Sequence, residues 1–502
     1  MDYSDLTFGT AGIRGLMGDD KGCLNNGSIG AIAESLAQAM DDMELKGTVV
    51  ICRDSRNQGK EFADLSAEIM ADYGHTVYLG TEPLPTPFLS YAIRVLKAVG
   101  GINITASHNP KEYNGFKAYG SDGAQIDTAY AEKVQAKLRH FSSAKQNRGG
   151  KVLPIPQEVY DLYLKTIVEN LALSKVDFGD LKAVYSPLHG SAGAFMTKLK
   201  EMAHLPLIMA ENQMKPDGDF PLAPKPNPEN PEVFDPLISQ VPDADLILTN
   251  DPDGDRLGVM VKDGDSYRLL SGNEAGLVLL YYLLTKEVTK TQGKFAAKSL
   301  VSSSLAETLC SHYGIPMVNV LVGFRYIASE IEKNEEGFLF GFEESGGYLA
   351  HPHARDKDGL EAACLILKAA AVYQKENRTL CQVLDEIYNT FGYVIDVTYS
   401  LEIPLEQCSK LMATVRSYGI DTIAGENVVS LVDLLAEESD MKANIIVIKT
   451  ANQRVILRPS GTEPKMKVYI SAQGDNMKKA RQQADLVYDD ICHIFDGIVQ
   501  LQ

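Results

Sequence analysis

A serine between turn-forming residues is the first candidate for covalent chemistry in this chain. The apolar run at residues 99–104 is typical of a buried strand, and the Asn109-Pro110 pair that follows predicts a turn. We therefore expect Ser107 on an exposed loop just past a strand, where open α/β sheets hold ligands. Its hydroxyl group can carry a covalent group between two half-reactions. Taken alone, the motif favours an ordinary polar turn over a catalytic serine.

Three aspartates at alternate positions are the candidate metal ligands. Asp251, Asp253 and Asp255 follow a short apolar run. Carboxylate oxygens in this spacing can converge on one hard cation such as Mg²⁺. An EF-hand is excluded, because Arg256 stands where that loop needs glycine and Lys262 where it needs a bidentate glutamate. A solvated acidic turn is the alternative, but the Arg256 guanidinium also suits phosphate chemistry, because it can clamp an oxyanion beside a metal.

Two further loops have the composition of phosphate-binding segments. Glycines in residues 8–15 allow backbone N–H groups to approach a phosphate, and Arg14 adds a positive charge. No Gly-Lys-Ser/Thr sequence follows, so this is not a P-loop, and a flexible turn is the alternative. Residues 458–465 gather arginine, hydroxyl groups, a glycine backbone and lysine, which together could form a pocket for a phosphate.

Two acidic loops could bind a sugar or move a proton. Residues 341–347 place Glu343, Glu344 and Ser345 between glycines, and carboxylates accept hydrogen bonds from sugar hydroxyls. Lys357 lies between acidic residues at a predicted helix start, and it could transfer a proton if its surroundings lower its pKa. An acidic turn and a solvated run of charges are the respective alternatives.

The composition narrows the class of protein. A chain of 502 residues predicts three or four domains. No apolar run is long enough for a transmembrane helix and no signal peptide is visible, so we expect a cytoplasmic protein. The seven cysteines are scattered, which favours a reducing compartment over disulfides or a zinc site. The net charge of −19 argues against nucleic-acid binding, and nothing in the sequence indicates the oligomeric state.

The pattern of strand, polar turn, helix and strand is predicted three times, within residues 49–79, 183–208 and 295–318. In the first repeat the polar turn is Arg-Asp-Ser-Arg at residues 53–56. Three such units imply parallel or mixed sheets covered by helices on both faces. From about residue 393 the strands are shorter, and a helix is predicted near residues 477–495, which indicates an α+β module.

The serine, aspartate, sugar and phosphate loops occur in the order found in the α-D-phosphohexomutases, and the chain resembles that superfamily over essentially its whole length. The resemblance is to phosphoglucomutases and phosphomannomutases, with the bacterial α-phosphoglucomutases most similar. It implies an α/β fold of four domains around a central cleft: three related mixed-sheet α/β domains and a C-terminal α+β domain. We expect the domains to span residues 1–171, 172–270, 271–391 and 392–502.

The resemblance also implies the role of each site residue. Ser107 is similar to the residue that carries the phosphoryl group, and with Asp251, Asp253 and Asp255 it is expected to form the Mg²⁺ site. Glu343 and Ser345 resemble the ligands of the sugar hydroxyls. The pocket for the non-reacting phosphate is expected at Arg458, Ser460, Gly461 and Thr462. Residues expected near the transferring group are Arg14, His108, Lys117, Arg256 and Lys357.

The implied reaction interconverts α-D-glucose 1-phosphate and glucose 6-phosphate through a phosphoserine and a hexose 1,6-bisphosphate. Glucose 1,6-bisphosphate is the expected phosphorylating activator, and a phosphosugar the expected partner. The Glu-Glu-Ser sugar loop resembles phosphoglucomutases, and Gly347 and Tyr348 replace the histidine of dual-specificity members. A phosphomannomutase, a phosphopentomutase and, from a different class, a sugar-phosphate phosphatase or a binding protein are the alternatives.

Overall fold

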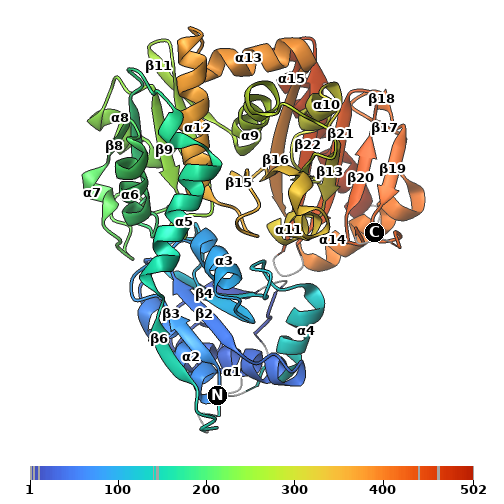
Figure 1. Cartoon of the computed structure of the whole chain (residues 1–502). Coiled ribbons are helices and arrows are strands. Elements are labelled where there is room, and N and C mark those ends of the chain that lie inside the picture. The colour runs from blue at the N-terminus through green and yellow to red at the C-terminus, as the bar shows by residue number, and fades with distance from the viewer. Residues whose placement is uncertain are drawn as a thin grey trace. The chain divides into compact units, whose positions relative to one another are not determined.

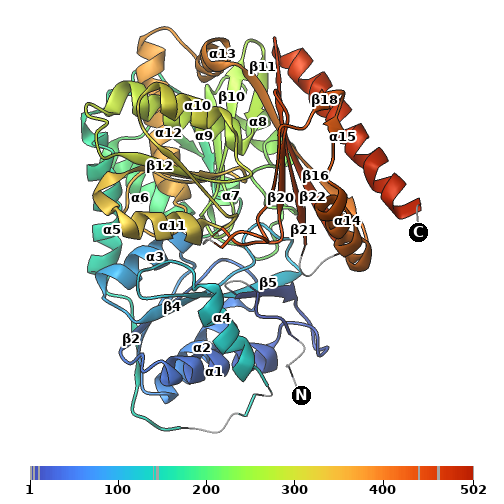
Figure 2. The same ribbon diagram turned by 90° about the vertical axis from the view of Figure 1, so that its right-hand side faces the viewer.

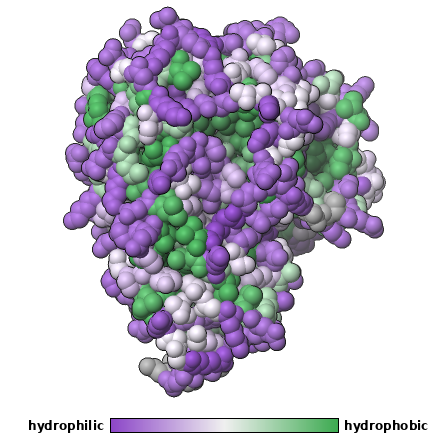
Figure 3. All heavy atoms as spheres, viewed as in Figure 1, coloured by the Kyte–Doolittle hydropathy of each residue, from purple (hydrophilic) through white to green (hydrophobic). Residues whose placement is uncertain are grey.

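The computed structural model describes residues 3, 6–9, 12–139, 141–142, 146–438, 441–460 and 464–500. The chain forms two compact units. The first contains Met1–Leu279 and Phe324–Cys381, and the second contains Leu280–Gly323 and Gln382–Gln502. Helices and strands are labelled in Figures 1 and 2. Polar residues cover most of the face in Figure 3, as expected for an acidic chain, with scattered apolar side chains between them.

The first sheet lies in the first unit and has the strand order β1-β5-β4-β2-β3-β6. Strands β4, β2, β3 and β6 are parallel, while β5 runs antiparallel to β4 and to β1. Figure 2 shows α1 and α2 on one side of this sheet and α3 on the other, as right-handed crossovers require. The elements are β1 (Gly12–Leu16), α1 (Asn26–Asp42), β2 (Thr48–Arg53), α2 (Gly59–Asp72), β3 (Thr76–Leu79), α3 (Thr86–Val95), β4 (Gly100–Ile104), β5 (Tyr113–Tyr119), α4 (Thr128–Lys137) and β6 (Lys151–Pro154).

The second sheet is also in the first unit, in the order β11-β10-β9-β7-β8. Strand β7 is parallel to β8 and β9, and β10 is antiparallel to β9 and β11. The elements are α5 (Gln157–Asn170), η1 (Leu173–Lys175), β7 (Ala183–Ser186), α6 (Gly193–Ala203), β8 (Leu207–Met209), α7 (Glu211–Met214), η2 (Pro231–Val233), α8 (Asp235–Gln240), β9 (Leu246–Asn250), β10 (Leu257–Asp263) and β11 (Ser266–Leu270).

The third α/β region contributes segments to each unit. In the second unit β12 and β13 are parallel, and in the first unit β14 and β15 are antiparallel. The elements are α9 (Gly272–Tyr282), η3 (Leu283–Glu287), β12 (Phe295–Ser299), α10 (Leu305–His312), β13 (Met317–Val320), α11 (Phe324–Lys333), η4 (Glu335–Gly337), β14 (Phe338–Glu343), β15 (Gly347–Leu349), α12 (Gly359–Lys375) and α13 (Leu380–Phe391).

The C-terminal region is an antiparallel sheet with two packed helices. Its strand order is β16-β22-β21-β20-β19, and α14 and α15 pack on it over an apolar core. The elements are β16 (Tyr393–Glu402), α14 (Leu405–Tyr418), β17 (Thr422–Ile423), β18 (Glu426–Asn427), β19 (Ser430–Asp433), β20 (Ile446–Lys449), β21 (Gln453–Pro459), β22 (Lys465–Gly474) and α15 (Met477–Gln500).

These sheets confirm the predicted class of three mixed α/β regions followed by an α+β module. All three predicted strand-helix-strand repeats form, as β2-α2-β3, β7-α6-β8 and β12-α10-β13, and each pair of strands is parallel. The seven cysteines are all free, and five of them are buried. Among the described residues, no helix combines the length and apolar character needed to cross a bilayer.

Candidate active site

Ser107 lies three residues beyond the end of β4, as its sequence context predicts. Its backbone is in the left-handed region with φ of +52°, an uncommon conformation for serine. The Oγ donates a hydrogen bond to Asp251 Oδ2 at 2.7 Å. The expectation that Ser107 is exposed is wrong, because its side chain is turned toward the aspartate loop and only 1% of the residue is accessible.

The three aspartates lie on the tight turn between β9 and β10. Gly254, with φ of +68°, allows the chain to reverse there, and all three carboxylates are buried. One oxygen from each comes within 4.8 Å of the others. The Oδ1 atoms of Asp253 and Asp255 are buried without a hydrogen-bond partner among the described residues. Converging, unpaired carboxylate oxygens are the donors that Mg²⁺ prefers, so the residues fit a divalent cation.

Two lysines approach the aspartates from different elements. Lys117, on β5, brings its Nζ to 2.7 Å from Asp253 Oδ2 and 3.7 Å from Asp255 Oδ2. Lys357 lies just before α12, and its Nζ is 3.0 Å from Asp255 Oδ2 and 3.1 Å from Asp356 Oδ1. The second oxygens of Asp253 and Asp255 are thus held by protein cations, while their first oxygens stay unpaired.

The pKa values follow from this arrangement. Burial raises the pKa of Asp251 well above its usual range, and the neighbouring Asp253 and Asp255 add to the effect. Burial alone would also raise the pKa of Asp253, but Lys117 holds it well below the usual range. A lowered pKa was the condition for proton transfer by Lys357, and the structure does not meet that condition. The burial of Lys357 is outweighed by Asp255 and Asp356, which raise its pKa, so the side chain stays an ammonium group.

His108 is the neutral group beside the serine. Its Nδ1 is 3.4 Å from Ser107 Oγ. Burial lowers the pKa of His108 well below its usual value, and the guanidinium groups of Arg256 and Arg14 lower it further. The imidazole is therefore uncharged at neutral pH, and its lowered pKa makes it a weak proton acceptor.

The metal loop and the sugar loop are adjacent through their backbones. Arg256 pairs with Gly347 as an isolated β-bridge, and the Leu257 amide donates to the Gly346 carbonyl at 2.9 Å. Glu343 ends β14 and is buried. Its carboxylate is close enough to Arg256 and Lys357 to help raise the pKa of both side chains. Ser345 follows in the turn before β15. A Cβ at Gly347 would lie 2.1 Å from Lys357 Cδ, so this position requires glycine while Lys357 keeps its place.

The first unit therefore brings Ser107, the aspartates and the nearby cations together. The predicted phosphate loop belongs to the second unit. Arg458 lies near the end of β21, and the Ser460 amide donates to the Lys465 carbonyl at 2.8 Å. Gly461 and Thr462 fall outside the described residues.

Several contacting residues were not singled out from the sequence. Thr86 donates to Asp253 Oδ2 at 2.9 Å, and Asn103 donates to Thr86 at 2.7 Å. Arg56 contacts the carbonyl groups of the Ser107 loop. The polar turn at residues 53–56 was the only local signal, and its partners lie about fifty residues away along the chain.

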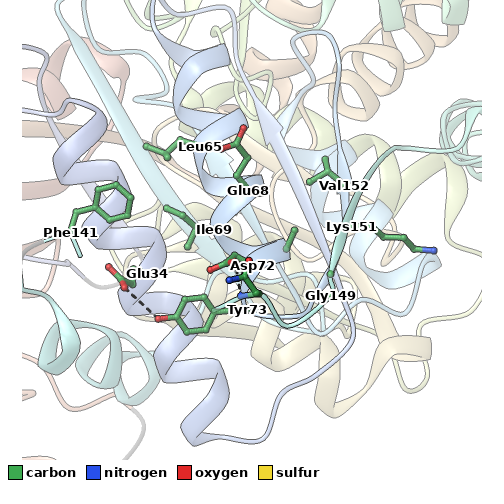
Figure 4. Close-up of a pocket in the computed structure, with 13 residues that line it drawn as sticks. Glu34, Leu65, Glu68, Ile69, Asp72, Tyr73, Phe141, Gly149, Lys151 and Val152 are labelled. Atoms are coloured by element: carbon green, nitrogen blue, oxygen red, sulfur yellow. Dashed lines mark hydrogen bonds between the residues drawn. The ribbon is translucent and has the colours of Figure 1, made fainter. Parts of the chain in front are cut away.

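A cavity of about 720 Å³ lies elsewhere, between α1, α2 and β6. Figure 4 shows Glu34, Ile69 and Tyr73 on its walls, with a hydrogen bond between Tyr73 and Glu34. None of its lining residues belongs to the Ser107 and aspartate cluster, so this cavity is not the reacting site.

Comparison with known families decides the class of this site. Models of the phosphoglucomutase/phosphomannomutase family match the chain four times: alpha/beta/alpha domain I at residues 5–145, domain II at 161–264, domain III at 271–391, and the C-terminal domain at 422–488. The chain belongs to this family. It is accordingly a phosphohexomutase, an isomerase that transfers a phosphoryl group within a sugar phosphate.

Individual relatives agree with this assignment. A phosphoglucomutase of Staphylococcus aureus (strain USA300) is 34% identical over 509 aligned residues, which cover 96% of this chain and 92% of the relative. The crystal structure of a phosphoglucomutase/phosphomannomutase family protein from Burkholderia thailandensis has a TM-score of 0.77 at 20% identity, covering 99% and 98% of the two chains. The open form of the Paramecium phosphoglucomutase parafusin has a TM-score of 0.75 at 17% identity, covering 100% and 96%. These two structures share the fold of this phosphohexomutase.

Proposed function

We propose that the protein interconverts α-D-glucose 1-phosphate and glucose 6-phosphate through a phosphorylated Ser107 and glucose 1,6-bisphosphate. The observation that carries the proposal is the 2.7 Å hydrogen bond between Ser107 Oγ and Asp251, which joins the nucleophile to the carboxylate cluster. A binding protein would not need both a phosphorylatable serine and three metal-binding carboxylates, and a phosphatase would release inorganic phosphate at the rate of substrate loss.

In the first half-reaction the phosphoryl group leaves Ser107 Oγ for a free hydroxyl of the sugar monophosphate. The bond from phosphorus to the serine oxygen breaks, a bond to the sugar oxygen forms, and the proton of the sugar hydroxyl passes to the serine oxygen, which becomes a hydroxyl again. The second half-reaction returns the other phosphoryl group of the bisphosphate to Ser107. Glucose 1,6-bisphosphate from solution would phosphorylate a free serine in the same way.

The surrounding side chains supply charge and proton placement. Lys117, Lys357 and Arg256 are cations that can stabilise negative charge on the transferring group. The Ser107 hydroxyl directs its proton at Asp251, and the uncharged His108 imidazole lies 3.4 Å from the same oxygen. Bound at Asp251, Asp253 and Asp255, Mg²⁺ would add Lewis-acid stabilisation of the phosphoryl oxygens.

Substrate placement is proposed for the remaining loops. Glu343 and Ser345 would bind hydroxyl groups of the sugar, and the loop with Arg458, Ser460, Gly461 and Thr462 would bind the phosphate that is not reacting. The choice of glucose rests on the Glu-Glu-Ser sequence of the sugar loop and on the similarity to phosphoglucomutases.

The covalent role is tested by Ser107→Ala. Turnover should be nearly abolished, and intact-mass analysis of the wild type should show one phosphate that the variant lacks. Ser66→Ala is a matched control, because this buried hydroxyl donates to the Phe62 carbonyl of its own helix and lies outside the site. Wild-type turnover in Ser107→Ala would contradict the mechanism.

The sugar is tested by comparing kcat/KM for glucose 1-phosphate, mannose 1-phosphate and ribose 1-phosphate. Glucose 1-phosphate should give the highest value. A higher value for one of the other two would leave the mechanism intact and replace glucose as the substrate. Release of inorganic phosphate at the rate of substrate loss would instead identify a phosphatase.

A further inference from the structure

Ser107 is held by a set of buried side chains with no direct role in phosphoryl transfer. We propose that Asp54, Arg56 and Thr105 are positioning residues that hold the Ser107 backbone from both sides, in the conformation from which its hydroxyl reacts. The inference rests on the proposed role of Ser107 as the phosphorylated residue.

Arg56 binds the loop through its carbonyl oxygens. Its Nη2 donates to the carbonyls of Ser107 at 2.5 Å and Asn109 at 2.6 Å. Its Nη1 donates to the carbonyls of Pro110 at 2.8 Å and Tyr113 at 3.0 Å. One planar guanidinium therefore holds three carbonyls of the irregular Ser107 loop and the carbonyl of Tyr113, the first residue of β5. A lysine ammonium has too few donors to make the same contacts.

Thr105 binds the other side of the serine. Its Oγ1 accepts a hydrogen bond from the Ser107 amide at 2.8 Å and donates one to Asp54 Oδ2 at 2.5 Å. Arg56 Nε donates to the same Asp54 oxygen at 3.1 Å. The amide and the carbonyl of Ser107 are thus both connected to one carboxylate, the first through Thr105 and the second through Arg56.

The surroundings make this arrangement rigid. The side chains of Arg56 and Asp54 are completely buried, and the Phe220 ring covers the guanidinium with its centroid 5.2 Å from Cζ. Burial raises the pKa of Asp54, and Arg56 is the strongest opposing influence, so the carboxylate depends on this pair for its charge. Loss of either partner would leave the other charge buried and unpaired, so the ion pair keeps both side chains in place against the loop.

The backbone conformation explains why positioning is needed. A left-handed serine is strained and persists only where its surroundings impose it. If the hydrogen bond to its amide or its carbonyl is lost, Ser107 can relax to an ordinary backbone conformation, and its Oγ then moves away from Asp251. A displacement of about 1 Å at a reacting atom can reduce the rate about 100-fold.

The test uses Thr105→Val, Thr105→Ser and Arg56→Lys. Single-turnover phosphorylation of Ser107 by glucose 1,6-bisphosphate is followed by intact-mass analysis, and the affinity for glucose 1-phosphate is measured by calorimetry. We expect phosphorylation to slow about 10- to 100-fold in Thr105→Val and Arg56→Lys while the affinity changes less than about threefold. Thr105→Ser keeps the hydroxyl and should recover most of the rate.

Val134→Ala is the control for lost stability, because Val134 is fully buried in α4 of the same sheet domain and makes no polar contact. An equal slowing in Val134→Ala, or a wild-type rate in Thr105→Val, would overturn the inference. Ser107→Ala separates the two proposals. If the Ser107→Ala variant is phosphorylated at another site, Ser107 is not the phosphorylated residue. If that variant is not phosphorylated but Thr105→Val reacts at the wild-type rate, only the positioning role is contradicted. If Arg56→Lys does not fold, the comparison of valine and serine at position 105 still decides the question.

Discussion

At the scale of single residues, the carboxylates of the metal loop divide their oxygens between two tasks. The Oδ2 atoms of Asp253 and Asp255 contact lysine ammonium groups, and Asp253 Oδ2 also accepts from Thr86. Their Oδ1 atoms are buried and unpaired among the described residues. The protein cations thus orient the carboxylates, and the second oxygens remain available to a metal.

Asp253→Asn should raise the Mg²⁺ concentration needed for half-maximal activity at least about 10-fold, because it removes a charged hard ligand. Calorimetric titration with Mg²⁺ should show the same loss independently of turnover. Asp263→Asn, an exposed position at the end of β10 in the same sheet, should leave both values unchanged. Full wild-type activity in excess chelator, with no residual metal by elemental analysis, would contradict the metal assignment.

Gly347→Ala should lower kcat about 10- to 100-fold, because the new methyl group would occupy the place of Lys357 Cδ and displace the ammonium from Asp255. Steady-state kinetics, together with a thermal melt, would measure the effect. Gly22→Ala is the matched control, since nothing lies within 4 Å of the added atom. Equal kinetics in the two variants would show that the position of Lys357 does not matter.

Residue types and spacing predicted Ser107 and the aspartates, because the chemistry of both is encoded within a few neighbouring positions. The same reasoning could not find Arg56, Thr86 or Asn103 as site residues. Their importance comes from partners far away in the sequence, such as the Ser107 carbonyl that Arg56 binds. The altered pKa of Lys357 likewise depends on Asp255, which only the folded chain brings close.

At the scale of helices and strands, the sequence pattern predicted the parallel units, whose short strands and intervening helices are separated by turn residues. It did not predict β1 or β5. Residues 8–15 are rich in glycine and resemble a flexible turn, yet Gly12–Leu16 forms a strand because it pairs with β5 along its whole length. Position 12 must be glycine in this pairing, because a Cβ there would lie 2.1 Å from the Phe116 carbonyl oxygen. Tertiary pairing overrides local preference in such segments.

The start of α12 is an element whose stability should depend on pH. Asp358 caps the helix by accepting from the Leu360 and Glu361 amides, and it also contacts His353 Nε2 at 2.9 Å. Burial alone would lower the pKa of His353, but Glu361 and Asp358 raise it above 6.5. A raised folded-state pKa means that the contribution to stability is complete below pH 6.5 and is lost as the pH rises through the folded pKa.

His353→Gln should therefore destabilise the protein by about 1.5–3 kcal/mol at pH 6, and by less at pH 9. Urea unfolding at both pH values would measure the difference between variant and wild type. His204→Asn, at an exposed position that ends α6, is the matched control for the loss of a histidine side chain. A destabilisation by His353→Gln that increases toward pH 9 would contradict the assigned direction.

At the scale of the whole molecule, the family resemblance supplied the four-domain organisation. The length of the chain alone predicted three or four domains without their arrangement. The structure confirms three mixed α/β regions and an antiparallel C-terminal sheet. The expected boundaries at residues 171, 270 and 391 stay predictions. The chain divides into two compact units, each made of two separate segments, and this division does not test the four expected domains. An acidic chain of net charge −19 must concentrate positive charge locally to bind an anionic substrate, and Arg14, Lys117, Arg256 and Lys357 meet that need around Ser107.

The C-terminal loop allows a final prediction about turnover in both directions. During the proposed cycle the two phosphates of the bisphosphate exchange places, so one anion site must accept the 6-phosphate in one orientation and the 1-phosphate in the other. Arg458→Ala removes a guanidinium near the end of β21. Loss of a charged bidentate contact costs about 1.5–3 kcal/mol, so kcat/KM should fall roughly 10- to 150-fold for glucose 1-phosphate and glucose 6-phosphate alike. Arg416→Ala, which removes an arginine paired with Asp433 in the same sheet domain, should leave both values near wild type. A large loss for only one of the two monophosphates would show that the loop serves a single orientation, and the exchange would then need a second phosphate site.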